Sequence, residues 1–412
     1  MMRILIANWS RRRAGGTETY LEQVMTALAA RGHDLAFCFE VDEPEGRPEI
    51  QLTGSTFSVP LRPDLSGSIE QLVKWKPDVS YVHGLLEPAT EARLLDVAPA
   101  VLAAHSYYGT CISGEKTHKF PIVQPCGRRF GAACLALYFP RRCGGLSPVS
   151  MMTAYGRQRR RLALLDRYAA VVTPSEHMHR EFVRHDAAGG RVYTLPHGID
   201  ASAVAPSPRA ASGRLAPGSA VRLMLIGRLD RLKGGGALLD ALPRVRTMIG
   251  RPLQLTFAGV GPARAAWEQH ARAIARAHPD LSIEFAGWLQ PDALTARLAA
   301  TDVVVMPSLW PEPFGLAGLE ANRLGVPVVA YATGGIPEWL RDGVNGCLAP
   351  GNPPTVQGLA DALARCVRSL ESGDDLTRGA LAAARAHDDR RHVDALLDIL
   401  GRAAAGADRL SA

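Results

Sequence analysis

The sequence predicts an α/β protein made of two doubly wound parallel-sheet domains, and three observations lead to this prediction. The chain has 412 residues, which is past the size at which a single hydrophobic core stops growing, so two domains of about 200 residues are expected. Short apolar runs alternate with longer helical patterns from end to end, which is typical of a parallel sheet wrapped by helices. The segment from Ile199 to Ser219 is rich in Pro, Ala, Ser and Gly and lacks both periodicities, which indicates an exposed connection between the two halves.

The expected strands are short apolar runs bounded by turn residues. In the first half they are Arg3–Ala7, Leu35–Phe39, Val79–His83, Ala100–His105, Ala169–Thr173 and Val192–Leu195. In the second half they are Val221–Ile226, Leu253–Ala258, Ser282–Ala286, Asp302–Met306 and Val326–Ala330. Each half is expected to form its own sheet, with domains at residues 1–200 and 220–385 and a linker at 201–219.

Composition limits the class of protein. The chain is 47% hydrophobic and 21% charged, which predicts a folded protein with a sizeable core rather than a disordered one. The formal net charge of +7 favours a polyanionic partner, which could be phosphate groups, nucleic acid or an acidic membrane. No apolar run is long enough for a membrane span or a signal peptide, so a cytoplasmic location is expected. Seven cysteines, an odd number, indicate reduced thiols rather than a disulfide framework.

The first glycine-rich loop follows the first expected strand, in the segment AGGTETY from Ala14 to Tyr20. Gly15 and Gly16 would let backbone N–H groups approach a phosphate at the start of a helix that Thr17 could cap. An ordinary tight strand-to-helix turn explains the same residues equally well. The loop lacks the spaced three-glycine fingerprint of dinucleotide-binding domains, which argues against a dehydrogenase.

The second domain opens with a strand followed by GRLDRLKGGG, Gly227 to Gly236. Arg228 and Lys233 are therefore expected at the carboxyl end of that strand, where open parallel sheets bind ligands. Two cations at this edge would neutralise a diphosphate leaving group. The alternative is a solvated basic turn.

The strongest local pattern is PEPFGLAGLEANRLGVPVVA, Pro311 to Ala330, which contains Glu312 and Glu320. A helix starting near Gly315 would present the N–H groups of Phe314, Gly315 and Leu316 to a diphosphate. Glu320 lies in an otherwise apolar run, where an unpaired charge is costly. The two carboxylates are therefore expected to reach different parts of one ligand, with Glu320 suited to a ribose diol and Glu312 to a transferred sugar.

Taken together, the ordered segments resemble family 4 of the retaining glycosyltransferases, which have the GT-B fold of two Rossmann-like domains facing across a cleft. The resemblance covers nearly the whole chain. Its segments are GGTETY near the start, PSEHMHREF at Pro174 to Phe182, LPHGID at Leu195 to Asp200, GRLDRLKG, the paired glutamates, and GGIPEWLRDGVNGCL at Gly334 to Leu348.

The resemblance implies a role for each matching residue. It places Gly16 near the donor phosphate, Arg228 and Lys233 on the diphosphate, Glu312 on the donor sugar, Glu320 on the ribose, and His105 of AAHSYYG in the active site. It also implies retention without a protein nucleophile, no cofactor and no obligatory metal, because the two cations take the place of a divalent ion. A helix over 386–412 is expected, by the same analogy, to pack back on the first domain. His197 in LPHGID departs from the family, which usually has Asn at that position.

A basic segment with four cysteines, residues 111–161, is the least explained part of the sequence. No acidic residue lies between Glu115 and Asp166. The segment could lie on an anionic membrane, bind a phosphorylated acceptor, or form a solvated surface. Its cysteines, Cys111, Cys126, Cys134 and Cys143, lack the close pair typical of zinc sites, so buried thiols or a redox-sensitive pair are favoured over a metal. The cations are Lys116, Lys119, Arg128, Arg129, Arg141, Arg142, Arg157, Arg159, Arg160 and Arg161.

The sequence therefore predicts a retaining, hexosyltransferase-type glycosyltransferase that uses a UDP- or GDP-sugar. The expected acceptor is a lipid-linked or membrane-proximal glycan in cell-surface polysaccharide or glycolipid synthesis, with the enzyme peripheral on the inner face of the membrane. Two alternatives remain: transfer to a small soluble acceptor, and a non-catalytic nucleotide-sugar binder on the same fold. No nucleic-acid recognition module is visible, so nucleic acid is not an expected partner.

Overall fold

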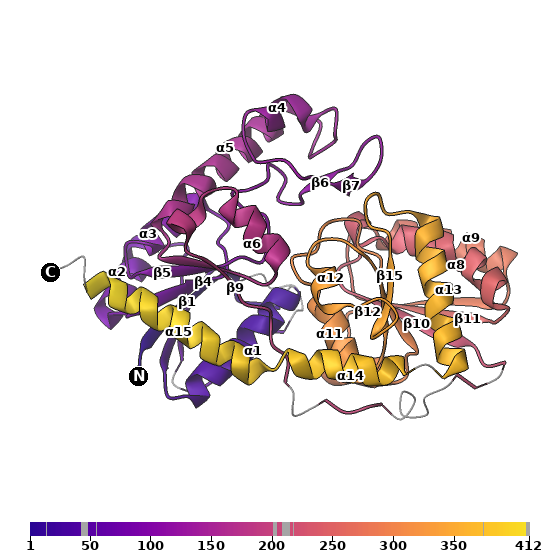
Figure 1. Cartoon of the computed structure of the whole chain (residues 1–412). Helices are drawn as coiled ribbons and strands as arrows, with labels where there is room; N and C mark the ends of the chain where they lie inside the picture. Colours follow the sequence, from indigo (N-terminus) through magenta and orange to yellow (C-terminus); the bar gives the residue numbers. More distant parts are fainter. Residues whose placement is uncertain are drawn as a thin grey trace. The chain divides into compact units, whose positions relative to one another are not determined.

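The computed structural model describes residues 1–13, 15–42, 48–54, 56–200, 204–207, 215–216, 218–373 and 375–408, and these form two compact units (Figure 1). The first unit contains Met1–Lys116, Gly127–Gly198 and the chain from Asp389 on, and the second contains Thr117–Cys126 and Ile199–Asp388. The grouping differs from the expected first domain, because residues 117–126 belong to the second unit. Most of the expected linker at 201–219 lies outside the described residues.

The first unit is built on a parallel sheet of seven strands in the order β3-β2-β1-β4-β5-β8-β9. In β1, an interior strand of this sheet, the side chains of Ile4 to Ala7 are fully buried, as expected for a strand that is covered by helices on both faces. The strands are β1 Arg3–Ser10, β2 Asp34–Val41, β3 Phe57–Pro60, β4 Val79–Val82, β5 Ala100–Ala103, β8 Ala170–Thr173 and β9 Val192–Thr194.

The last helix of the chain, α15 (Asp389–Asp408), packs against β4 and α1 of the first unit. It buries Leu396 and Leu400 completely, and His392 Nε2 lies 2.8 Å from the Tyr20 hydroxyl on α1. The other helices of this unit are α1 Gly16–Ala30, α2 Leu65–Trp75, α3 Pro88–Leu94, α4 Ala133–Tyr138, α5 Pro148–Leu164, η1 Leu165–Arg167, α6 Glu176–Val183 and η2 Ala187–Gly190.

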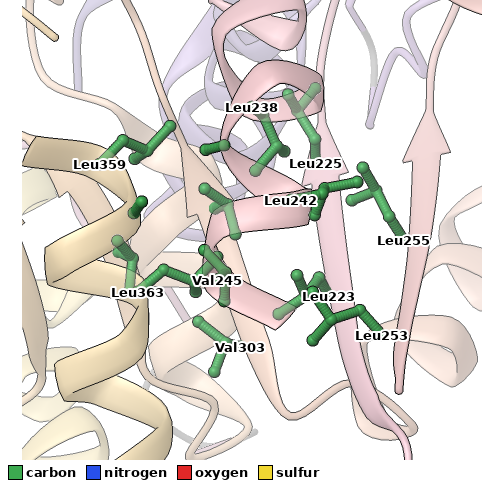
Figure 2. Close-up of a cluster of buried hydrophobic side chains, with 14 of the residues drawn as sticks. Leu223, Leu225, Leu238, Leu242, Val245, Leu253, Leu255, Val303, Leu359 and Leu363 are labelled. Carbon is green, nitrogen blue, oxygen red and sulfur yellow. The ribbon is translucent and has the colours of Figure 1, made fainter. Parts of the chain in front are cut away.

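The second unit is built on a parallel sheet of six strands in the order β12-β11-β10-β13-β14-β15. Leucines of β10 and β11 pack against α8 and α13 in the core that Figure 2 shows, with Leu225, Leu242 and Leu363 among its members. The strands are β10 Val221–Ile226, β11 Leu253–Ala258, β12 Leu281–Gly287, β13 Val303–Met306, β14 Val328–Tyr331 and β15 Gly346–Ala349, with a small antiparallel pair of β6 Thr117–His118 and β7 Gln124–Pro125. The helices are η4 Arg231–Lys233, α8 Gly235–Ile249, α9 Arg264–Ala277, α10 Pro291–Ala299, α11 Leu316–Arg323, α12 Ile336–Trp339, α13 Val356–Ser372 and α14 Leu376–Ala386.

Two edge strands were not expected from the sequence. β3 has only four residues and ends in a proline, and β15 lies in a glycine-rich stretch, so neither shows the apolar run that marks the central strands. The strand expected at Val326–Ala330 begins two residues later, at Val328, because Pro327 has no N–H to donate to a neighbouring strand.

In each sheet the strand order reverses next to the first strand, between β1 and β4 and between β10 and β13. Ligands of open α/β sheets bind outside the carboxyl ends of strands at such a reversal. In the second unit, the residues after β10 include Arg228 and Lys233, and those after β13 include Glu312. The topology therefore brings the two most informative sequence segments to one edge.

Candidate active site

The center of the candidate site is an ion pair between Lys233 and Glu312. Lys233 Nζ lies 2.6 Å from Glu312 Oε1. The loops that carry the two residues are joined directly, since the Leu309 N–H donates to the Leu232 carbonyl at 2.7 Å. Gly234 has a φ of +74°, and a side chain there would collide with the Pro307 carbonyl oxygen. The close approach of the two loops at this point requires glycine.

The Glu312 carboxylate is almost fully buried, with 4% of the residue exposed. Besides Lys233, Glu312 Oε1 accepts hydrogen bonds from Ser308 Oγ at 2.5 Å and Trp310 Nε1 at 2.8 Å. Three donors thus converge on one carboxylate oxygen and compensate the cost of burying its charge. The Lys233 ammonium also lies 5.5 Å from the centroid of the Trp310 ring, so Trp310 supports both members of the pair.

The segment Glu312–Gly315 is held in place by the chain that follows β14. The Gly335 N–H donates to the Glu312 carbonyl at 2.8 Å, and Trp339 Nε1 donates to the Phe314 carbonyl at 2.7 Å. Gly315, with a φ of +94°, precedes the first residue of α11. The first N–H groups of a helix lack intrahelical acceptors, so the predicted donors at Phe314, Gly315 and Leu316 lie at the start of α11, beside Glu312.

Arg228 and Glu320 lie on the elements that carry or follow these two residues. Arg228 is exposed and pairs with Asp230 at 3.3 Å. Glu320 lies on α11, where burial raises the pKa of its carboxyl and Arg323 partly opposes that shift. The structure therefore brings Lys233 and Glu312 into contact, and it places Arg228 and Glu320 on neighbouring elements.

In the first unit, the loop after β1 differs from the expectation in its capping. Helix α1 begins at Gly16 with Gly15 as its N-cap, so Thr17 is not the cap. The Gly15 N–H donates to Glu18 Oε2 at 2.8 Å, and the Trp9 indole N–H donates to Glu18 Oε1 at 3.2 Å. Glu18 performs the capping because a carboxylate in the first turn accepts from otherwise unpaired N–H groups. The Gly15 donor is thus occupied by the protein itself.

His105 lies in a cluster of aromatic side chains that the sequence analysis did not identify. The ring stacks on His197 with centroids 5.4 Å apart, and its Nε2 lies 2.9 Å from Nδ1 of His83. The Tyr20 ring lies against both His105 and His392. The sequence did contain a signal for His83, because this polar residue directly follows the apolar strand Val79–Val82. Nothing in the sequence links His392 to His83.

All four histidines of this cluster are held neutral. Burial lowers the pKa of His105 and of His392 to about 4. Burial also lowers the pKa of His83 and of His197 well below the ordinary value, and neighbouring histidines add to the shift. The cluster can donate and accept hydrogen bonds at neutral pH without carrying charge.

The first unit is therefore expected to lose stability in mild acid. An unfolded histidine has a pKa of about 6.5, so between pH 6.5 and 4 the unfolded chain binds more protons than the folded one. The stability from His392 is complete above pH 6.5, and up to about 3 kcal/mol of it is lost as the pH falls through 4. Urea unfolding of the first unit, measured between pH 7.5 and 5, should show the larger part of this loss. His392→Gln should flatten the slope, and His270→Gln, on α9 outside the cluster, should not. Equal slopes for all three proteins would refute the assignment.

The basic segment does not form one continuous cationic surface. Lys116 is buried, and its Nζ bonds to Glu181 and, at 3.2 Å, to the Thr110 carbonyl. The Arg161 guanidinium is also buried, where it donates to the Leu85 and Leu86 carbonyls at 2.8 Å. Two more cations have carboxylate partners, in the pairs Arg129–Asp186 at 2.7 Å and Arg157–Glu87 at 3.8 Å. All three interpretations of the segment place its cations at the surface, and this is wrong for Lys116 and Arg161, whose charged groups are buried in the first unit.

All seven cysteines are free thiols, and Cys111 is buried whereas Cys126, Cys134 and Cys143 are partly exposed. Within the described ranges, no three or more His, Cys, Asp or Glu side chains are grouped so that they could hold a metal ion. Among the helices of the described chain, none has both the length and the apolar character needed to cross a membrane.

Comparison with known proteins identifies the family. The model described as Glycosyltransferase Family 4 matches residues 14–203, and the model described as Glycosyl transferases group 1 matches residues 220–369. A D-inositol 3-phosphate glycosyltransferase of Mycolicibacterium gilvum is 32% identical over 423 residues, which cover 95% of this chain and 86% of the relative. A second D-inositol 3-phosphate glycosyltransferase, from Saccharomonospora viridis, is 37% identical over 234 residues. This match covers 54% of this chain and 52% of the relative, so the chain spans about half of that relative's length.

Solved structures agree on the fold. Anabaena HepE in complex with UDP and glucose superposes with a TM-score of 0.69 at 19% identity, covering 97% of this chain and 100% of HepE. At 19% sequence identity, the structural similarity to HepE establishes only that the two proteins share a fold. The predicted fold class and family resemblance are thus confirmed: the chain is a glycosyltransferase of GT-B fold that belongs to family 4.

Proposed function

We propose that this chain transfers a sugar from a nucleotide diphosphate donor, a UDP- or GDP-sugar, with retention of anomeric configuration. The observation that carries the proposal is the ion pair of the partly exposed Lys233 with the buried Glu312, at the strand-order reversal of the second unit and beside the start of α11. A cation, a carboxylate and the first N–H groups of a helix at one edge suit a sugar diphosphate, which has a negative leaving group and a hydroxyl-rich ring.

The proposed reaction needs no protein nucleophile. The bond between the sugar C1 and the β-phosphate oxygen breaks, and its electron pair goes to the departing diphosphate. The acceptor hydroxyl attacks C1 from the same face, and its proton goes to a diphosphate oxygen. Lys233, Arg228 and the N–H groups of Phe314 to Leu316 stabilise the negative charge as it develops. Glu312 faces the sugar as positive charge develops on it, and Glu320 binds the ribose.

Two further roles belong to the same proposal. The family resemblance implies that His105 acts in sugar transfer and that Gly16 allows close approach to a donor phosphate. We further propose that the reaction requires no metal, because Arg228 and Lys233 supply positive charge where a divalent ion would otherwise neutralise the diphosphate.

For the acceptor, a surface of the first unit favours a membrane-proximal substrate. The chain from α4 into α5 exposes Phe139, Leu146, Val149 and Met152, with Leu146 82% and Val149 75% exposed. Arg159 and Arg160 are exposed further along α5. Val149 and Arg160 are eleven residues apart, and Met152 and Arg159 are seven residues apart. These spacings are close to whole helical turns, so all four side chains lie on one face of α5. We propose that this apolar and basic face, named the α5 face, lies on an anionic membrane that carries the acceptor.

The protein should therefore co-sediment with anionic vesicles, and binding should weaken as salt rises. Each cation near an anionic bilayer contributes about 1 kcal/mol, so Arg159→Ser with Arg160→Ser should weaken binding by roughly 10- to 30-fold. Arg161 is left unchanged because its guanidinium is buried. As a control of equal charge, Arg365→Ser with Arg368→Ser, on α13 of the second unit, should bind as the unmodified protein does. No sedimentation at low salt, or equal weakening by both pairs, would refute a membrane-binding α5 face.

A second acceptor class is favoured by the relatives, which carry the name D-inositol 3-phosphate glycosyltransferase. A small phosphorylated polyol would also suit a chain with a net charge of +7. The two acceptor classes are distinguished by supplying each one to the same enzyme.

The test of the whole proposal is a donor and acceptor matrix. Purified protein is incubated with UDP-, GDP- and ADP-sugars, each with D-inositol 3-phosphate or with a lipid-linked glycan in anionic vesicles. Nucleoside diphosphate release and the anomeric configuration of the product are measured. An α-product from an α-linked donor supports retention, and a β-product refutes it. Release from none of the donors, with either acceptor or with water alone, refutes transferase activity with these nucleotides.

A further inference from the structure

The two histidines His83 and His105 form a hydrogen-bonded pair with a geometry that restricts their protons. His83 Nδ1 lies 2.9 Å from His105 Nε2, and the two ring planes differ by only 15°. The lone pair and the N–H of an imidazole lie in the ring plane. The ring centroids are 5.1 Å apart while the two nitrogens are 2.9 Å apart, so the rings meet edge to edge and allow a well-aligned hydrogen bond. One of the two nitrogens must donate and the other must accept.

The surroundings of His83 decide which nitrogen donates. His83 is 5% exposed, and its Nε2 is buried without a hydrogen-bond partner among the residues that the structure describes. A buried N–H without an acceptor is rarer and more costly than an unused acceptor. The nearby Tyr20 hydroxyl does not change this balance, because it is engaged with Tyr81 at 2.9 Å and His392 at 2.8 Å. The proton of neutral His83 therefore belongs on Nδ1.

We infer that His83 is a positioning residue: it donates from Nδ1 to His105 Nε2 and so holds His105 in the tautomer that carries its proton on Nδ1. The ring nitrogen that bonds to a fixed donor cannot itself carry a proton, which fixes the role of the other nitrogen. His105 then offers an N–H donor, rather than a lone pair, to its ligand. A donor suits a sugar hydroxyl oxygen or a phosphate oxygen, and it excludes His105 as a general base through Nδ1.

The ligand of His105 in this inference rests on the proposed function, but the tautomer does not. Other neighbours limit rotation of the His105 ring, since His197 stacks on it at 22° between planes and Tyr20 packs against its edge. Both neighbours hold the ring, and His83 fixes its protonation.

The decisive measurement is the tautomer of His105 in the full chain, read from long-range nitrogen–proton correlations of ¹⁵N-histidine-labelled protein. The His105 signals are assigned by their loss in His105→Gln. We expect Nδ1 protonated and Nε2 unprotonated near neutral pH. A proton on His105 Nε2 in the unmodified protein overturns the inference, whether or not the chain proves to transfer sugar.

Matched substitutions at His83 test the consequence for activity. An Asn side-chain amide can occupy the position of Nδ1, so His83→Asn keeps the donor. His83→Leu removes it with a similar apolar volume, and a Gln amide reaches the position of Nε2 instead. Loss of a group that orients an active-site histidine costs about 10- to 100-fold in activity. We expect that loss in kcat/KM for His83→Leu and His83→Gln, together with a shift of the His105 proton to Nε2, and rescue of both by His83→Asn. Equal kinetics for the Asn and Leu variants would overturn the positioning role.

Discussion

Replacing Glu312 by glutamine is expected to lower kcat for sugar transfer on the order of 100- to 1000-fold while the protein still folds. Glutamine has the same shape, and its amide oxygen can accept from Ser308 Oγ and Trp310 Nε1 as Glu312 Oε1 does. The negative charge that faces the oxocarbenium-like sugar in the proposed reaction is lost. Steady-state transfer with the best donor measures the effect, and a thermal melt confirms folding.

Glu284→Gln is the matched control for this substitution. Glu284 also binds a cation, Arg297, at 2.7 and 2.9 Å, but this pair lies exposed at the surface. Loss of this pair should leave kcat unchanged within a factor of about two, because an exposed ion pair contributes little to the stability of the fold. Turnover at the unmodified rate in Glu312→Gln would remove Glu312 from the proposed chemistry.

Removing either cation of the candidate diphosphate site, as Lys233→Ala or Arg228→Ala, should slow turnover on the order of 100-fold. In the proposed reaction each cation faces charge that develops on the leaving group. Lys233→Ala has a second consequence, because it leaves the buried Glu312 carboxylate without its counterion. Arg231→Ala is the control, since it removes an exposed cation from the same loop. Unchanged rates for both site variants would mean that the leaving group is stabilised elsewhere.

The same assay tests the metal-free proposal. Activity should persist in EDTA, because the protein's own cations supply the positive charge. A complete loss of activity in EDTA that magnesium or manganese restores would refute this proposal.

The central strands and the ends of those strands could be predicted from the sequence, because apolar runs and turn residues are local signals. Lys233 was expected at a sheet edge and Glu312 just ahead of a helix, but their contact depends on a strand order that no local pattern encodes. The interior cations could not be found this way. Lys116 reaches a partner 65 residues away, Glu181, and a basic side chain looks the same in a sequence whether it is buried or solvated.

The histidine cluster was missed for the same reason. Tyr20 and His392 meet across 372 residues, and each occurs alone in an ordinary helical pattern. A sequence pattern predicts a site when its residues follow strands that are neighbours in the sheet. His392 instead lies on α15, which follows the whole second unit in the chain, so no such pattern includes it.

The position of α15 has a consequence for how the chain is made. The first unit obtains part of its core, including Leu396, Leu400 and the Tyr20–His392 contact, from residues that are translated after the whole second unit. Domains usually fold during synthesis in order from the N-terminus. In this chain the sheet that is translated first remains without one of its covering helices until the second unit has been completed. A ribosome that stalls before Asp389 would therefore hold a nascent first unit with part of its apolar surface open to chaperones.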